Sequence, residues 1–163
     1  MKHLEIIQSK IHTIDTIQPL LAMWRFKSEK IVFSNGCFDI LHRGHVEYLS
    51  KAADLGKHLI IGLNTDASIK RIKGPSRPVQ DENARSIVLA SLRFVDAVIL
   101  FDEDTPYNLI AAVKPDILVK GSDYKPEEIV GYDIVTKNGG EVVTIDLVEG
   151  YSTTNIVNRL SKG

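Results

Sequence analysis

Short runs of valine, isoleucine and leucine recur along this chain, and segments whose apolar residues have helical spacing separate them. Strands that are apolar along their whole length are buried on both faces, which is typical of a parallel sheet with helices on each side. The sequence therefore predicts an α/β fold built on a five-stranded parallel sheet. The predicted strands are residues 31–34, 58–64, 96–100, 116–120 and 141–145.

Helical segments lie before and between these strands. They are residues 4–11, 17–26, 45–56, 66–72, 82–94, 106–113, 126–138 and a last helix from about Thr154. Alternation of strands and helices predicts a Rossmann-like three-layer sandwich over residues 30–163. Because the first two helices precede the first strand, residues 1–29 are expected to form an N-terminal helical extension.

The composition narrows the functional class. Hydrophobic residues make up 44% and charged residues 25%, as in an ordinary globular protein. The net charge of −1 gives no long-range attraction to nucleic acid, and no apolar run reaches the roughly 18 residues that span a bilayer. The N-terminus lacks the features of a signal peptide, so a cytoplasmic location is expected. The single cysteine excludes an internal disulfide and a cysteine-based zinc cluster.

Polar residues follow four of the predicted strands. In an open parallel sheet, ligands bind in the crevice outside the carboxyl ends of the strands, so these side chains are expected to meet at one edge. They are Gly36, Asp39, His42 and His45 after the first strand, Asn64 and Asp66 after the second, Lys120, Gly121 and Asp123 after the fourth, and Ser152, Thr153 and Thr154 after the fifth.

Two histidines, His42 and His45, flank Gly44 where a helix is expected to begin. The start of a helix offers free N–H groups and a positive dipole end, which favour phosphate. Gly44 has no side chain and lets an anion approach between the imidazoles. The two common phosphate-binding motifs, G-x-x-x-x-G-K-[ST] and G-x-G-x-x-G after the first strand, are absent.

Three interpretations of the pair compete. The histidines could make only local hydrogen bonds at the helix start. They could bind zinc with Asp39 as a third ligand, although no other side chain with suitable spacing completes the site. Alternatively, their N–H groups could stabilise charge on a phosphate during its transfer, which the setting of the pair favours.

The segment GCFDILHRGH resembles the signature of the cytidylyltransferase-like nucleotidyltransferases, which join a nucleoside monophosphate to a phosphorylated small molecule and release pyrophosphate. Further matches follow in order: GLNTDASIKRIKGPSRPV, RFVDAVILFDEDTP, PDILVKGSDY and GYSTTNIVNRL. The resemblance runs from about Ile31 to Leu160. Together these segments look most like the branch of the family that makes ADP-heptose for lipopolysaccharide.

The resemblance implies roles for individual residues. His42, His45 and Lys73 would be catalytic, with the histidines at the phosphates and Lys73 reaching the phosphates of the nucleotide. Asp39 would order the site and contribute to binding a metal ion. The residues implied to bind the nucleotide are Asn35, Gly36, Phe38, Asp39, Gly44, Asp66, Arg85, Gly121, Asp123, Ser152, Thr153, Thr154 and Arg159.

The function expected from the resemblance is transfer of a nucleoside monophosphate from a nucleoside triphosphate to a sugar phosphate, with Mg²⁺ as cofactor. The favoured pair is ATP and D-glycero-β-D-manno-heptose 1-phosphate, which gives ADP-heptose. A glycerol-3-phosphate cytidylyltransferase that uses CTP is the alternative within the family. A non-catalytic nucleotide-binding module is the alternative from another class, and the resemblance together with the N-terminal helices favours a homodimer.

Overall fold

The computed structural model describes residues 1–163 and contains one six-stranded sheet in the order β1-β4-β3-β2-β5-β6. Every neighbouring pair of strands is parallel, as predicted. The strands are β1 (Ile11–His12), β2 (Ile31–Gly36), β3 (His58–Asn64), β4 (Ala97–Phe101), β5 (Ile117–Gly121) and β6 (Glu141–Ile145).

The predicted number of strands, five, was wrong by one. Strand β1 comes from the N-terminal segment and pairs Ile11 with Val98 and His12 with Ile99 on the free edge of β4. A two-residue strand has no periodicity of its own, and Ile11 extended the helical pattern before it. The N-terminal segment is therefore not purely helical, because it adds an edge strand to the sheet. A domain boundary at residue 30 stays a prediction.

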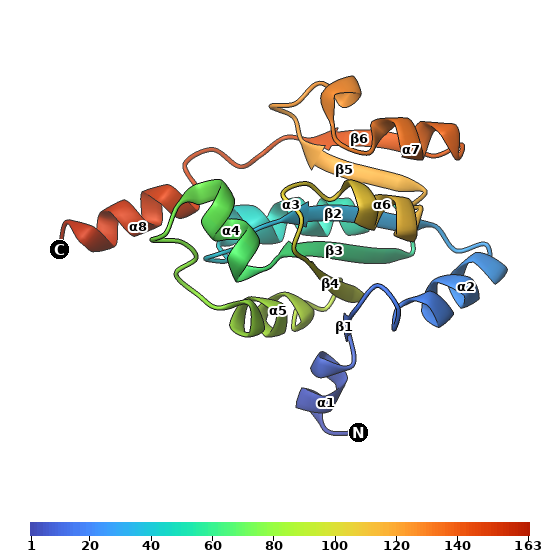
Figure 1. Ribbon diagram of the computed structural model, residues 1–163, viewed down its shortest axis with the longest axis horizontal. Coiled ribbons are helices and arrows are strands. Elements are labelled where there is room, and N and C mark those ends of the chain that lie inside the picture. The colour runs from blue at the N-terminus through green and yellow to red at the C-terminus, as the bar shows by residue number, and fades with distance from the viewer.

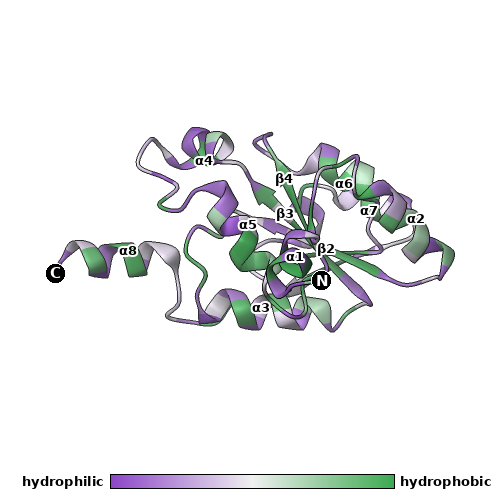
Figure 2. Ribbon diagram, turned by 90° about the horizontal axis from the view of Figure 1, so that it is seen from below, coloured by the Kyte–Doolittle hydropathy of each residue, from purple (hydrophilic) through white to green (hydrophobic).

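Helices cover both faces of the sheet (Figures 1 and 2). Side chains alternate along each strand, so that Phe33 joins one core with Trp24 of α2 and Val113 of α6, and Val32 joins another with Leu49 of α3. The two cores make this a three-layer sandwich. The helices are α1 (His3–Gln8), α2 (Gln18–Phe26), α3 (Arg43–Ala53), α4 (Asp66–Lys73), α5 (Glu82–Ala90), α6 (Tyr107–Val113), the 3₁₀ turn η1 (Pro126–Glu128), α7 (Tyr132–Lys137) and α8 (Thr153–Ser161).

The helix predicted over residues 126–138 is broken into η1 and α7. Gly131 separates them with a φ of +92°, and a Cβ atom there would lie 2.7 Å from Cδ1 of Ile110. The helical path of η1 already ends at Ile129, whose backbone is extended, and the left-handed conformation of Gly131, which suits glycine, precedes α7. None of the helices has both the length and the apolar character needed to cross a bilayer.

The order of the strands places the ligand crevice. From β2 the chain proceeds to β3 and β4 on one side and returns to β5 and β6 on the other. The carboxyl ends of β2 and β5 therefore flank the switch point, where ligands bind in folds of this kind. Helix α8 has no buried residues and projects beyond the sheet in both views (Figures 1 and 2).

Candidate active site

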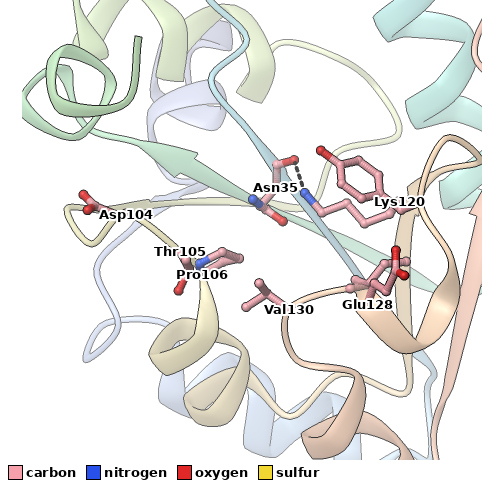
Figure 3. A pocket seen from close by; sticks show the side chains of 9 residues that line it. Asn35, Asp104, Thr105, Pro106, Lys120, Glu128 and Val130 are labelled. Carbon is pink, nitrogen blue, oxygen red and sulfur yellow. Dashed lines mark hydrogen bonds between the residues drawn. The ribbon is translucent and has the colours of Figure 1, made fainter. Parts of the chain in front are cut away.

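Four adjoining cavities form a trough along the carboxyl ends of the strands. The α6 cavity, shown in Figure 3, shares Asn35, Lys120 and Tyr124 with the central cavity. The central cavity lies next to the histidine cavity, which is lined by His42 and His45. The histidine cavity lies next to the α8 cavity, which is lined by His42 and by Arg159 of α8. The residues common to the central and histidine cavities are His45, Lys73, Leu147 and Thr153, and those common to the histidine and α8 cavities are His42 and Tyr151.

The two histidines stand at the start of α3 with their rings stacked, and the ring centroids are 3.8 Å apart. His42 caps the helix, and its backbone N–H donates to Nδ1 of His45 at 3.3 Å. Because Nδ1 accepts this bond, the neutral ring of His45 carries its proton on Nε2. The fold thus prepares His45 as an N–H donor at the junction of two cavities.

The surroundings of both imidazoles favour their neutral forms. Burial, with smaller contributions from His42 and Lys73, lowers the pKa of His45 to about 4. Burial also lowers the pKa of His42. Nδ1 of His42 is buried and has no hydrogen-bond partner in the protein. The pair therefore supplies polar ring atoms rather than positive charge, and the cations of the trough are Lys73, Lys120 and Arg159.

Gly44 keeps His42 in place. A Cβ atom at this position would lie 3.0 Å from Nδ1 and Cε1 of His42 and 3.1 Å from Cβ of Tyr151. We expect Gly44→Ala to displace the His42 ring and to lower kcat roughly ten- to a hundredfold, since small misplacements are costly in catalysis. Helix propensity favours alanine, so the melting temperature should not fall by more than a few degrees. Ser50→Ala, on the same helix, is the control and should leave kcat unchanged.

Segments distant in sequence complete the trough around the two histidines. Lys73, the last residue of α4, lines the central and histidine cavities. Ser152 caps α8 and accepts a hydrogen bond from the Asn155 N–H at 3.0 Å, and it also lines the histidine cavity. Arg159 lines the α8 cavity beside His42. The predicted residues Thr153 and Thr154 lie in the histidine cavity as well.

The glycine turn after β2 shapes the central cavity. Phe38 has a φ of +44°, and its ring meets the His45 ring edge to face at 5.2 Å. A Cβ atom on Gly36 would lie 2.9 Å from this ring, and one on Gly121 would lie 2.7 Å from Oδ1 of Asp123. The two glycines therefore make room for Phe38 and Asp123. All four line the central cavity, as does Asn35.

Asp39 lies beneath the trough rather than in it. Its side chain is 2% exposed and accepts hydrogen bonds from the N–H groups of Val79 and Gln80 and from Nε of Arg77. Burial alone would raise the pKa of Asp39, but these bonds keep it below its ordinary value. The carboxylate clamps the loop before α5 against the turn after β2. The sequence motif marks the residue without showing that its partners are protein atoms.

Arg85 and Asp66, which the resemblance implies bind the nucleotide, also lie outside the four cavities, and their contact with the nucleotide stays a prediction. Arg85 is 1% exposed and donates to the carbonyl groups of Cys37 and Asn64 at 2.8 Å, to that of Gln80 at 3.0 Å, and to the Asp66 carboxylate at 2.7 Å. The guanidinium therefore braces the loops that carry the site.

The protein side chains do not build a metal site by themselves. No group of three or more histidine, cysteine, aspartate or glutamate side chains is arranged to hold an ion. Asp39, the predicted metal ligand, is already engaged by three N–H donors. A catalytic zinc site needs three protein ligands, and His42, His45 and Asp39 do not form such a group.

Of the residues that line the α6 cavity, only Asn35 was among the predicted site residues, and Lys120 was not. Lys120 stood among the polar residues after the fourth predicted strand, and an isolated lysine at the end of an apolar strand was the available signal. Thr105 and Tyr124 lie within the matching segments RFVDAVILFDEDTP and PDILVKGSDY, but the resemblance assigned them no role, and Glu128 lies in η1, outside those segments.

A model of the cytidylyltransferase-like family matches residues 33–159. Two curated relatives, both described as bifunctional protein HldE, come from Syntrophotalea carbinolica and a Caulobacter species. They are 54% identical over 93% of this chain and 51% identical over 98% of it. The matched regions are 31% and 33% of the relatives, so the chain spans about a third of their length.

A solved structure of similar fold is the lipopolysaccharide core biosynthesis protein from Thermoplasma volcanium. Its sequence is 33% identical, and the match has a TM-score of 0.64. The match covers 74% of this chain and 99% of the other chain.

Proposed function

Because the chain belongs to the cytidylyltransferase-like family, we propose that it transfers the adenylyl group of ATP to D-glycero-β-D-manno-heptose 1-phosphate and releases pyrophosphate. The observation that carries the proposal is the stacked, neutral histidine pair, which lines a trough together with Lys73 and the start of α8. The heptose is supported by the sequence segments that resemble the ADP-heptose branch. The lipopolysaccharide role of the similar Thermoplasma volcanium protein agrees with that choice.

In this reaction an oxygen of the sugar phosphate forms a bond to the α-phosphorus of ATP. The bond from that phosphorus to the oxygen bridging the β-phosphate breaks, and its electron pair leaves with pyrophosphate. A sugar phosphate has a second pKa near 6 and is largely dianionic at pH 7, so the attacking oxygen needs no general base. The role proposed for the trough is therefore to supply hydrogen-bond donors and positive charge, and not to supply a general base.

The residues act by position and electrostatics. Nε2–H of His45 donates to an oxygen of the α-phosphate as charge builds there, and the stacked ring of His42 lies beside it. The start of α3 adds its dipole to this stabilisation. Lys73 neutralises the phosphates from the central side of the trough. Arg159 and the start of α8 hold the departing pyrophosphate from the other side.

Magnesium is expected to bind together with ATP. Since the side chains do not form a metal site, Mg²⁺ is expected to arrive bound to the phosphates of ATP, as it commonly does in enzymes that use nucleoside triphosphates. It would supply charge neutralisation for the triphosphate.

Pyrophosphate release with a matrix of substrates tests the proposal. ATP and CTP are each paired with D-glycero-β-D-manno-heptose 1-phosphate and with glycerol 3-phosphate. We expect release with ATP and the heptose phosphate, at a kcat/KM at least a hundredfold above the other pairs. Release with CTP and glycerol 3-phosphate alone would replace the heptose assignment with the cytidylyltransferase alternative. Nucleotide binding without release from any pair would favour the non-catalytic module.

The homodimer stays a prediction. The side chains of Leu4, Met23 and Phe26 on the N-terminal helices are exposed, and Phe26 is 92% exposed. Apolar side chains of this kind would suit a contact between two copies, and sedimentation of the purified chain measures the state directly.

A further inference from the structure

The α6 cavity lies at the switch point, at the opposite end of the trough from α8. It has a volume of about 200 Å³, below the 300–1,000 Å³ typical of pockets for drug-sized ligands. It is lined by the carboxyl ends of β2 and β5, the loop before α6, and η1 (Figure 3). Of the residues that the resemblance assigns to the nucleotide, only Asn35 lines it, and none of those assigned to the phosphates of ATP does. The space therefore suits one small molecule other than the nucleotide.

Lys120 is a half-buried cation that forms no ion pair within 4.0 Å, although the carboxylate of Asp123 lies close enough to raise its pKa. Its Nζ donates only to the carbonyl oxygen of Asn35, at the long distance of 3.5 Å, and no carboxylate forms an ion pair with it (Figure 3). Burial lowers the pKa of Lys120 to about 8, so the amine is still mostly protonated at pH 7. An ammonium that is largely removed from water and has unused donors favours an anion that can bind them.

A second unsatisfied group lines the same cavity. Oδ1 of Asn35 is buried and has no hydrogen-bond partner. Glu128, on another wall of the cavity, forms no ion pair, and the hydroxyl-bearing side chain of Thr105 lies nearby. Amide and carboxylate oxygens accept hydrogen bonds from hydroxyl groups and repel a phosphate. The cavity thus combines one site for an anion with several acceptors for hydroxyl groups.

We propose that the α6 cavity is the subsite for the acceptor, in which Lys120 binds the phosphate of a sugar phosphate while Asn35 and Glu128 bind its hydroxyl groups. The inference rests on the proposed function. Lys120 also lines the central cavity, so a phosphate bound to it lies next to the space for the α-phosphate. The acceptor then approaches from the end opposite α8, which leaves the α8 end free for pyrophosphate.

Two variants separate the two halves of this subsite. Lys120→Met keeps the length of the side chain and removes the charge, and Glu128→Ala removes a hydroxyl acceptor. Calorimetry with saturating α,β-methylene-ATP measures the Kd of D-glycero-β-D-manno-heptose 1-phosphate and of inorganic phosphate. We expect Lys120→Met to raise both Kd values roughly ten- to a hundredfold. Glu128→Ala should raise only the Kd of the sugar phosphate.

Controls distinguish a failed subsite from a failed function. Lys125→Met changes an exposed lysine outside the cavity and should change neither Kd. The Kd of α,β-methylene-ATP, measured alone, should be the same for Lys120→Met as for the wild type. The melting temperature of this variant should be equal to that of the wild type or higher, because a charge that is partly removed from water is gone. Unchanged acceptor binding in Lys120→Met, or an equal loss of ATP binding, would overturn the subsite even if the enzyme is active. Selective loss of acceptor binding would support it even if no transfer occurs.

Discussion

Replacing His45 with alanine will lower kcat for pyrophosphate release by about 10²–10³, because removal of one preorganised donor to a developing oxyanion has that effect in other enzymes. The backbone N–H of His42 fixes the tautomer of His45, and burial keeps its ring neutral. The KM for ATP should change by only a few fold, because the donor acts mainly in the transition state. Steady-state kinetics on the purified variant gives both values.

The matched control is His3→Ala, which removes an exposed imidazole near the N-terminus and should leave kcat at its normal value. Circular dichroism and thermal melting should show that His45→Ala is folded, since the ring lines an open cavity rather than the core. A kcat within threefold of the wild-type value in the folded variant would remove His45 from the mechanism.

Replacing Arg85 with methionine will lower the free energy of unfolding by about 3–5 kcal/mol. The change leaves three carbonyl groups without their donor and removes the partner of Asp66, whose own side chain is 30% exposed. Arg85→Lys should recover only part of the loss, because an ammonium cannot reproduce the planar fork of the guanidinium. Urea unfolding followed by circular dichroism gives the free energy.

Arg93→Met is the control for this prediction, because Arg93 is exposed and follows the same helix. It should change the free energy of unfolding by less than about 0.5 kcal/mol. Arg85→Met could instead unfold like the wild type and lose affinity for ATP. That result would mean that Arg85 contacts the nucleotide, as the resemblance implied, and would refute its role in holding the loops together.

The sequence predicted the strands best where apolar runs were bounded by turn residues. The bounds of β3 and β6 agree with the predicted ones, and β2, β4 and β5 differ by one or two residues. Strand β1 was not predicted, because a strand of two residues is too short to show a hydrophobic pattern. The break between η1 and α7 was not predicted, because the sequence pattern alone does not show that Ile129 is extended and that Gly131 has a positive φ.

The sequence predicted that the site lies at the carboxyl ends of the strands. It did not predict which of the side chains there line the cavities and which bind other protein atoms. His42, His45, Lys73 and the start of α8 meet in the trough as expected. Asp39 and Arg85 belong to the same motifs but bind protein atoms, since a motif marks a residue needed by the site without saying whether it faces the ligand. The α6 cavity depends on loops that only the fold brings together. The roles of all these residues in the reaction stay predictions.

A crystal structure with α,β-methylene-ATP would show whether the histidine pair faces the reacting phosphate. We expect an oxygen of the α-phosphate about 3 Å from Nε2 of His45, with the terminal phosphates directed toward the start of α8. An α-phosphate bound away from both histidines, with the rings turned from the trough, would refute the proposed role of the pair.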